Sequence, residues 1–152
     1  MVQYDDDDIR DLSERIIQSM EDLIDKVATD VEGNLQRNAP VDHGKLQGSF
    51  NRTVLSPFEH LIWSNTEYAI PVSEGYDAFT IEPTSAEKLA FEWPDAPPQV
   101  QKMFNKTFPV VFFKSVEHPG FEGTNYIPES VDQTKDRIDE FVESSLRGVG
   151  LL

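Results

Sequence analysis

Apolar residues recur at spacings of three and four over the first quarter of the chain, and this pattern constrains the fold more than any other feature. The stripe consists of Ile9, Leu12, Ile16, Met20, Leu23, Ile24, Val27, Val31 and Leu35. Such spacing places side chains along one side of an α-helix. We therefore predict one helix from Ile9 to about Asn38, roughly 45 Å long at about 1.5 Å per residue. A small domain does not need a helix of this length, so part of the stripe is expected to pack outside its own core, for example on a neighbouring subunit.

The chain changes from helical to strand periodicity within the segment Ala39 to Phe50. Pro40 cannot continue a helix and disfavours the helical conformation of the residue before it. Gly44 tolerates positive φ where the chain reverses, and the carboxylate of Asp42 can accept a hydrogen bond from the backbone two residues on. Leu46 then returns the chain to an apolar surface. The residues alone indicate a helix-to-strand turn.

The patterns beyond the turn are typical of strands. The predicted strands are Ser49–Leu55, Glu59–Ser64, Phe79–Glu82, Lys88–Trp93 and Val110–Val116. Leu61 and Trp63 alternate toward one face of the first hairpin, and Trp63 is predicted to lie in the core. The strand Val110–Val116 is apolar on both sides, which is typical of a central strand. A short helical turn is expected over Tyr68–Val72, ended by Gly75.

Two further segments complete the predicted fold. Pro94–Phe108 exceeds the usual length of a hairpin connection and is predicted to be a projecting loop. Pro128–Leu146 carries apolar residues at helical spacing and is predicted to be one C-terminal helix. The whole chain, residues 1–152, is therefore predicted to be a single α+β domain with an acidic tail at residues 1–8. It would contain a long N-terminal helix, an antiparallel or mixed sheet of four to five strands and a C-terminal helix packed on the sheet. The residues expected to be buried together are Leu23, Val27, Phe112 and Phe141.

Acidic residues outnumber basic residues by 28 to 13, which gives a formal net charge of −15. This balance argues against nonspecific binding to the phosphates of DNA. Two interpretations are compatible. Acidic surfaces with few lysines suit a high-salt cytoplasm, where charges are screened over about 3 Å at molar salt. Alternatively, the acidity lines a surface that DNA passes without binding. The acids Asp5–Asp8 are interpreted as stabilising a helix N-terminus, rather than as a metal site.

Few enzyme mechanisms fit the sequence. The chain has no cysteine, which excludes thiolate nucleophiles, and it contains no glycine-rich phosphate loop, nucleophile elbow or His-Glu-x-x-His motif. His43, His60 and His118 are far apart in sequence, which leaves open only a metal site that His60, His118 and carboxylates assemble in space. No apolar run is long enough to span a membrane and no signal peptide is recognised, so a cytoplasmic protein without membrane contact is expected.

Several short motifs follow one another in a specific order. After the long helix come Pro40, Asp42, Gly44 and Leu46, then Tyr68-Ala69, Glu74-Gly75, Lys88-Leu89-Ala90-Phe91, His118-Pro119-Gly120, and Tyr126-Ile127 at the start of the terminal helix. From Val31 to Leu146 this order resembles the tail-completion and head-tail joining family of tailed viruses. The chain departs from the family at His43, where a small hydroxyl residue is usual, and at Pro94–Phe108, which looks like an insertion.

The resemblance implies a structural virion protein of the neck, assembled in the host cytoplasm. In that family, subunits form a homo-oligomeric ring that joins the DNA-filled head, on the portal or connector side, to the tail. The expected partners are neighbouring neck or connector proteins and tail-terminator or tail-tube proteins, while the genome passes through without specific binding. Such a ring needs no catalytic residue, metal or cofactor. The alternative function is a small metal-dependent hydrolase or another host-acting viral enzyme built on the same α+β frame.

Overall fold

The computed structural model describes residues 5–41, 44–105 and 109–152. Within them the chain is α+β, with five α-helices, a long N-terminal helix among them, and antiparallel sheets of two strands each. It divides into two compact units. Unit 1 comprises Met1–Glu74 and Gly123–Leu152, and unit 2 comprises Gly75–Glu122.

Unit 1 is built on helix α1, which spans Asp6–Asn38 and confirms the predicted long helix. Its first turn takes in the end of the predicted acidic tail (residues 1–8), so that the carboxylates of Asp6–Asp8 lie where the helix dipole favours negative charge. The helix ends because Ala39, the residue before a proline, is extended (φ −60°, ψ 133°). The N–H of Ala39 still donates to the carbonyl of Leu35 at 3.0 Å, which closes the last turn.

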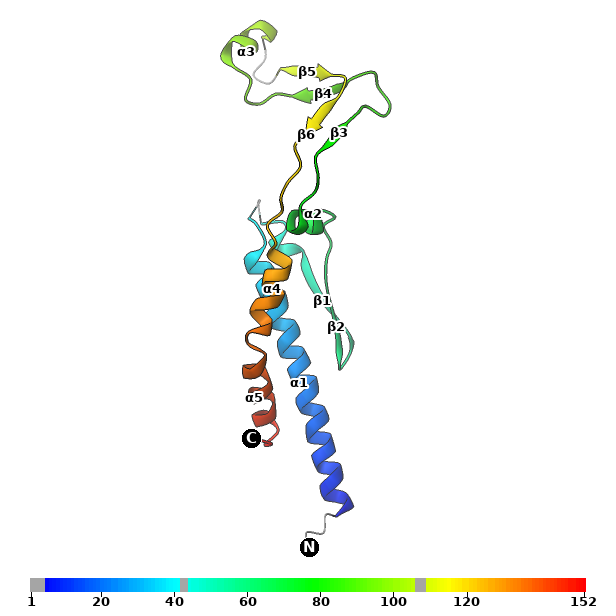
Figure 1. Ribbon diagram of the computed structural model, residues 1–152, viewed down its shortest axis with the longest axis vertical. Helices are drawn as coiled ribbons and strands as arrows, with labels where there is room; N and C mark the ends of the chain where they lie inside the picture. The colour runs from blue at the N-terminus through cyan, green and yellow to red at the C-terminus, as the bar shows by residue number, and fades with distance from the viewer. Residues whose placement is uncertain (1–4, 42–43, 106–108) are drawn as a thin grey trace. The chain divides into compact units, whose positions relative to one another are not determined.

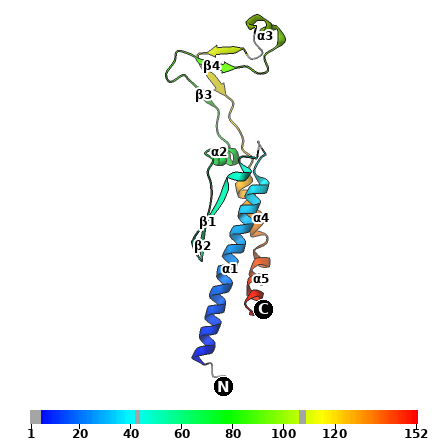
Figure 2. The same ribbon diagram turned by 180° about the vertical axis from the view of Figure 1, so that it is seen from behind.

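The C-terminal segment forms two helices, α4 (Tyr126–Lys135) and α5 (Ile138–Gly148), where one helix was predicted over Pro128–Leu146. Arg137, between them, leaves the helical conformation (φ −104°, ψ 2°). Both helices lie along α1 (Figures 1 and 2), whereas a C-terminal helix packed on the sheet was predicted. Polar contacts explain this packing, because the Nδ2 of Asn34 donates to the Oγ1 of Thr134 at 2.8 Å within the buried contact between α1 and α4.

The predicted first hairpin and the short helix after it are confirmed. Strands β1 (Phe50–Ser56) and β2 (Glu59–Ser64) pair antiparallel, and the 3₁₀ turn η1 (Gln47–Ser49) precedes them. Helix α2 spans Ala69–Glu74. These elements meet α1 and α4 in one small core, whose buried members are Leu35, Ala39, Leu46, Phe50, Ala69 and Tyr126. The core therefore lies at the C-terminal half of α1.

Unit 2 contains two strand pairs and one helix. Strand β3 (Phe79–Ile81) pairs antiparallel with β6 (Val116–His118), and β4 (Leu89–Glu92) pairs antiparallel with β5 (Val110–Phe113). Helix α3 (Pro98–Phe104) lies within the segment predicted to be a projecting loop, Pro94–Phe108, of which residues 106–108 lie outside the described structure. The predicted strand Val110–Val116 is divided between β5 and β6, which have different partners.

A single sheet of four to five strands is not confirmed, because the described strands form three separate pairs. The predicted common core is wrong. Phe112 is 63% exposed in unit 2, whereas Leu23, Val27 and Phe141 are half-buried in unit 1. The apolar run in β5 was interpreted as a central strand, but among the described strands β5 pairs only with β4. Its phenylalanine side chains, Phe112 and Phe113, therefore remain exposed, while Val110 and Val111 are half-buried.

Candidate assembly surfaces

Two motif residues of unit 1, Leu46 and Ala69, come together in the core. Tyr126, from α4, connects them to the C-terminal segment, because its Oη donates to the carbonyl of Ala69 at 3.0 Å. Gly44 has the predicted positive φ, 69°. Pro40 is half-buried after α1. The remaining motif residues of this unit are Asp42, which lies outside the described residues, and Tyr68 and Glu74, which are exposed.

The motif residues Gly75 and Gly120, 45 positions apart, lie at one crossing of two chain segments in unit 2. Both have positive φ (83° and 81°). A Cβ on Gly75 would lie 2.3 Å from the carbonyl oxygen of Phe121, and one on Gly120 would lie 2.8 Å from that of Tyr76. Tyr76 and Phe121 exchange two backbone hydrogen bonds, of 2.8 and 2.9 Å, while Pro119 is exposed. The two glycines therefore have a structural role, which is to let the two segments approach each other.

The N-terminal half of α1 carries the first exposed apolar surface, which we call the helix stripe. Its members are aliphatic or thioether side chains, and each of them is 42 to 56% exposed to solvent. They are Ile9, Leu12, Ile16, Ile17 and Met20. The C-terminal half of the same helix packs in the core through Val31 and Leu35. The apolar face thus continues beyond the core of unit 1, and its contact with a neighbouring subunit stays a prediction.

A second exposed surface, the hairpin face, lies on the side of β1–β2 that points away from α1. Arg52 turns toward α1, where its Nη1 donates to the Oδ1 of Asp25 at 2.9 Å. Strand alternation then directs Leu61 and Trp63 to the opposite side. Trp63 is 43% exposed and its Nε1 donates to the Oγ1 of Thr53, so the prediction that it lies in the core is wrong. The alternation was predicted correctly, but the apolar side is the outer one.

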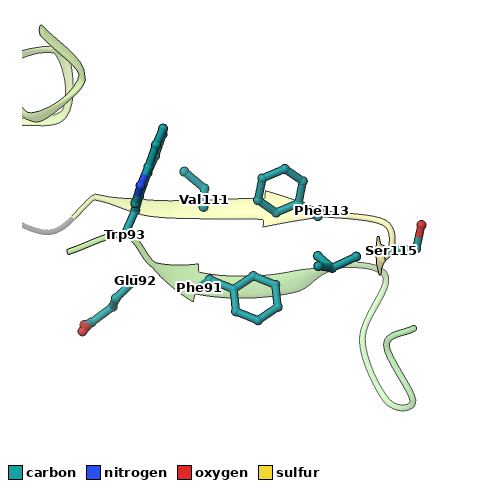
Figure 3. A pocket seen from close by; sticks show the side chains of 7 residues that line it. Phe91, Glu92, Trp93, Val111, Phe113 and Ser115 are labelled. Atoms are coloured by element: carbon teal, nitrogen blue, oxygen red, sulfur yellow. The ribbon is translucent and has the colours of Figure 1, made fainter. Parts of the chain in front are cut away.

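The third surface is a groove of about 500 Å³ over one face of β4–β5, which we call the strand-pair groove. Its apolar lining consists of Phe91, Trp93, Val111, Phe113 and Val116. Register explains the common face, because Phe91 lies opposite Val111 and Leu89 lies opposite Phe113. Figure 3 shows these side chains around the groove, with the carboxylate of Glu92 directed away from the Trp93 ring. A two-stranded sheet with such a face is marginally stable by itself in water.

Sequence reasoning did not identify the strand-pair groove as a site. The signal was present as the alternation of Phe91 with Trp93 and of Val111 with Phe113. Because Val110 and Phe112 make the other face apolar as well, the pattern was interpreted as burial within the chain.

The two histidines among the described residues, His60 and His118, lie in different units. The ring of His118 stacks on Phe79, with centroids 5.1 Å apart and planes 10° from parallel, and its Nδ1 accepts the N–H of Gly120 at 3.3 Å. His60 belongs to unit 1, and its buried Nδ1 has no hydrogen-bond partner among the described atoms. Within residues 5–41, 44–105 and 109–152, no group of three or more His, Cys, Asp or Glu side chains is arranged to hold a metal ion.

Electrostatic contacts of unit 1 also join α1 to α5. The ammonium of Lys26 lies 2.6 Å from the carboxylate of Asp22 and 2.9 Å from the hydroxyl of Ser144. Hydrogen bonds from Lys26 and then from Ser145 lower the pKa of Asp22. This cluster is partly exposed and connects two helices, so its evident role is structural.

No helix of the described residues is long and apolar enough to cross a membrane.

Comparisons with known proteins identify no relative of this chain. No family model matches it, and neither a curated protein nor a solved structure does. The resemblance to the tail-completion and head-tail joining family therefore stays a prediction that depends on the motifs of the sequence.

Proposed function

We propose that this protein is a structural component of the neck of a tailed virus, where copies form a ring that joins the DNA-filled head to the tail. The observation that carries the proposal is the presence of unlike apolar surfaces on the two units, namely the helix stripe on unit 1 and the strand-pair groove on unit 2. A subunit of a closed ring presents different patches to its two neighbours. The order of motifs from Pro40 to Gly120 supports the same role.

Burial in an assembly would offset the cost of these surfaces. Exposed apolar area is unfavourable by about 25 cal/mol per Å², and contiguous exposed patches of this kind mark interaction sites. In the proposed neck the surfaces contact other copies and the neighbouring connector, tail-terminator or tail-tube proteins. This role requires no reaction, metal or cofactor.

The sheet of four to five strands expected from the sequence is proposed to form between subunits. The hairpin β1–β2 has two strands, one face on α1 and an apolar outer face that includes Leu61 and Trp63. Sheets gain independent stability with three or more strands. We propose that strands from a neighbouring subunit extend this hairpin when the ring forms.

The distribution of charge supports passage of the genome without binding. Unit 1 contains 21 acidic and 9 basic residues, whereas unit 2 contains 7 acidic and 4 basic residues. An acidic wall repels phosphate, so that DNA slides past it. We therefore propose that unit 1 lines the lumen of the ring.

Electron microscopy of a deletion mutant tests the proposed function. Heads should still package DNA and tails should still polymerise, because neither process needs the joint, but the two should accumulate separately and infectivity should be lost. Normal, stable and infectious virions would contradict the neck assignment. Empty heads would instead place the role in packaging or capsid assembly.

A further inference from the structure

We propose that the helix stripe of one copy docks in the strand-pair groove of the next copy, and that this contact repeats around the ring. The repetition of the contact around a ring rests on the proposed function, whereas the contact itself follows from the chemistry of the two surfaces. Each surface lies within a single unit, the helix stripe in unit 1 and the strand-pair groove in unit 2.

The apolar chemistry of the two surfaces is complementary. The main line of the stripe, Ile9, Leu12, Ile16 and Met20, follows spacings of three and four and presents a ridge of flexible aliphatic and thioether side chains. The groove, lined mainly by aromatic rings, is open along one face of a strand pair. Its rings of Phe91 and Phe113 are tilted, with centroids 6.4 Å apart, and leave space between them and Trp93. A helix packed across a sheet is a common way to bury both faces.

Charge favours the strand-pair groove as the surface on which the helix stripe docks. Residues 5–25 contain nine acidic and two basic side chains, a net charge of −7. The described residues 88–105 and 109–114, which include β4, α3 and β5, contain three lysines and two acids, a net charge of +1 in a chain whose total is −15. Lys88 precedes Leu89 and Lys114 lies between Phe113 and Ser115, which both line the groove, while the charged residue of the lining itself is Glu92. Neither lysine forms an ion pair with a described residue.

The same charges disfavour contacts between like surfaces. Two stripes brought together would face one strongly acidic segment with another, and two grooves would bring together two segments of net positive charge. Like charges in contact oppose association, whereas unlike charges steer it. The favoured contact therefore joins unlike surfaces. Such a heterologous contact leaves a free stripe on one subunit and a free groove on the other, so it can propagate around a ring.

Site-specific crosslinking tests this contact, because the chain has no cysteine of its own. We would mix full-length Ile16→Cys and Phe113→Cys chains, which carry tags of different size, and treat them with a short bismaleimide. Each variant has one thiol, so every crosslink joins two chains. Both positions are exposed, which makes the variants compatible with folding. Leu12→Cys with Phe91→Cys is the second pair, and circular dichroism checks the fold of each variant.

Matched controls place the thiol outside the two surfaces. Gln36→Cys lies on an exposed position of the same helix, and Thr84→Cys lies on an exposed position of unit 2. We expect the mixed stripe-to-groove product to exceed both control mixtures and both like-with-like products at least tenfold. The variant Lys88→Glu/Lys114→Glu in the groove chain should reduce the mixed product severalfold.

Three results would overturn the docking proposal: a dominant stripe-to-stripe product, a dominant groove-to-groove product, or crosslinking no greater than in the controls for both pairs at millimolar protein. These results are separate from the test of function. Purified virions that contain many copies of the chain, but give no stripe-to-groove crosslink, would refute the docking and leave the neck assignment intact. Stable joining of heads to tails without the chain would refute the neck assignment, whatever the crosslinks show.

Discussion

Replacement of Tyr126 is the most direct test of the core of unit 1. The residue is 1% exposed, its Oη donates to the carbonyl of Ala69 at 3.0 Å, and its ring meets Phe50 edge-to-face at 6.1 Å. It therefore joins α4 to α2 and β1. Tyr126→Phe removes the hydrogen bond and keeps the ring, whereas Tyr126→Ala also leaves a cavity.

The two variants are expected to differ in a defined way. Loss of one buried hydrogen bond lowers the free energy of unfolding by about 0.5 to 1.5 kcal/mol. Truncation of a buried aromatic ring to alanine costs about 3 to 5 kcal/mol, a large part of a total stability of about 5 to 15 kcal/mol. At about 2 to 4 °C per kcal/mol, Tyr126→Phe should lower Tm by about 1 to 6 °C and Tyr126→Ala by about 6 to 20 °C.

Urea denaturation followed by circular dichroism measures both values, with Tyr68→Phe as the matched control. Tyr68 lies one residue before α2 and is exposed, so this variant should change the free energy of unfolding by less than about 0.5 kcal/mol. If Tyr126→Ala unfolds at the same urea concentration as the parent chain, the core described here is wrong. If Tyr126→Phe and Tyr68→Phe lower the free energy of unfolding equally, the hydrogen bond of Tyr126 is contradicted but the burial of its ring is not.

Alkaline pH gives an independent measurement on the same residue. Burial raises the pKa of Tyr126 above its ordinary value of 10.0. Above pH 10 the unfolded chain releases this proton more readily than the folded chain, so the contribution of Tyr126 to stability is present below pH 10 and is lost as pH rises through the folded pKa. Tyr126→Phe should reduce the slope of stability against pH above 10, and an unchanged slope would contradict the burial of this hydroxyl.

Three further predictions concern the surface. If the acidic excess is an adaptation to high salt, Tm should rise from dilute buffer to molar KCl as the Debye length falls from about 10 Å at 0.1 M to about 3 Å at 1 M, and a flat or falling Tm would remove that interpretation. Phe112→Asp should leave stability within about 0.5 kcal/mol, because Phe112 is 63% exposed, and a large loss of stability would show that Phe112 is buried. The isolated chain should be a monomer or weak oligomer by analytical ultracentrifugation, since a contact as small as one helix on a strand pair holds weakly without a template. A stable closed ring in dilute solution would contradict this template dependence.

The elements of this fold were predictable from sequence where the signal is local. The apolar spacing of α1 is continuous over Ile9–Leu35, and Pro40 marks its end, so both its type and its C-terminal boundary were predicted correctly. The strand positions follow from β-branched and aromatic runs. The break at Arg137 was missed, because neither proline nor glycine stands between α4 and α5 to indicate it.

Pairing and burial were less predictable, because both depend on residues far apart in the chain. Periodicity shows that Leu61 and Trp63 share a side of their strand, but it does not show whether that side faces α1 or solvent. Phe112 was assigned to the core for the same reason. Hydrophobic patterning identifies a face that avoids water, and a surface used for assembly gives the same pattern as a core.

The acidity and the exposed apolar surfaces are connected in the proposed assembly. A subunit that exposes the helix stripe, the hairpin face and the strand-pair groove before it joins a ring is at risk of nonspecific association. A net charge of −15 opposes random encounters between copies, because most approaches bring acidic surfaces together. The approach of residues 5–25 to the described residues of 88–114 is the exception, since it joins a net charge of −7 to one of +1. Charge would thus keep free subunits apart and still permit the one contact that builds the ring.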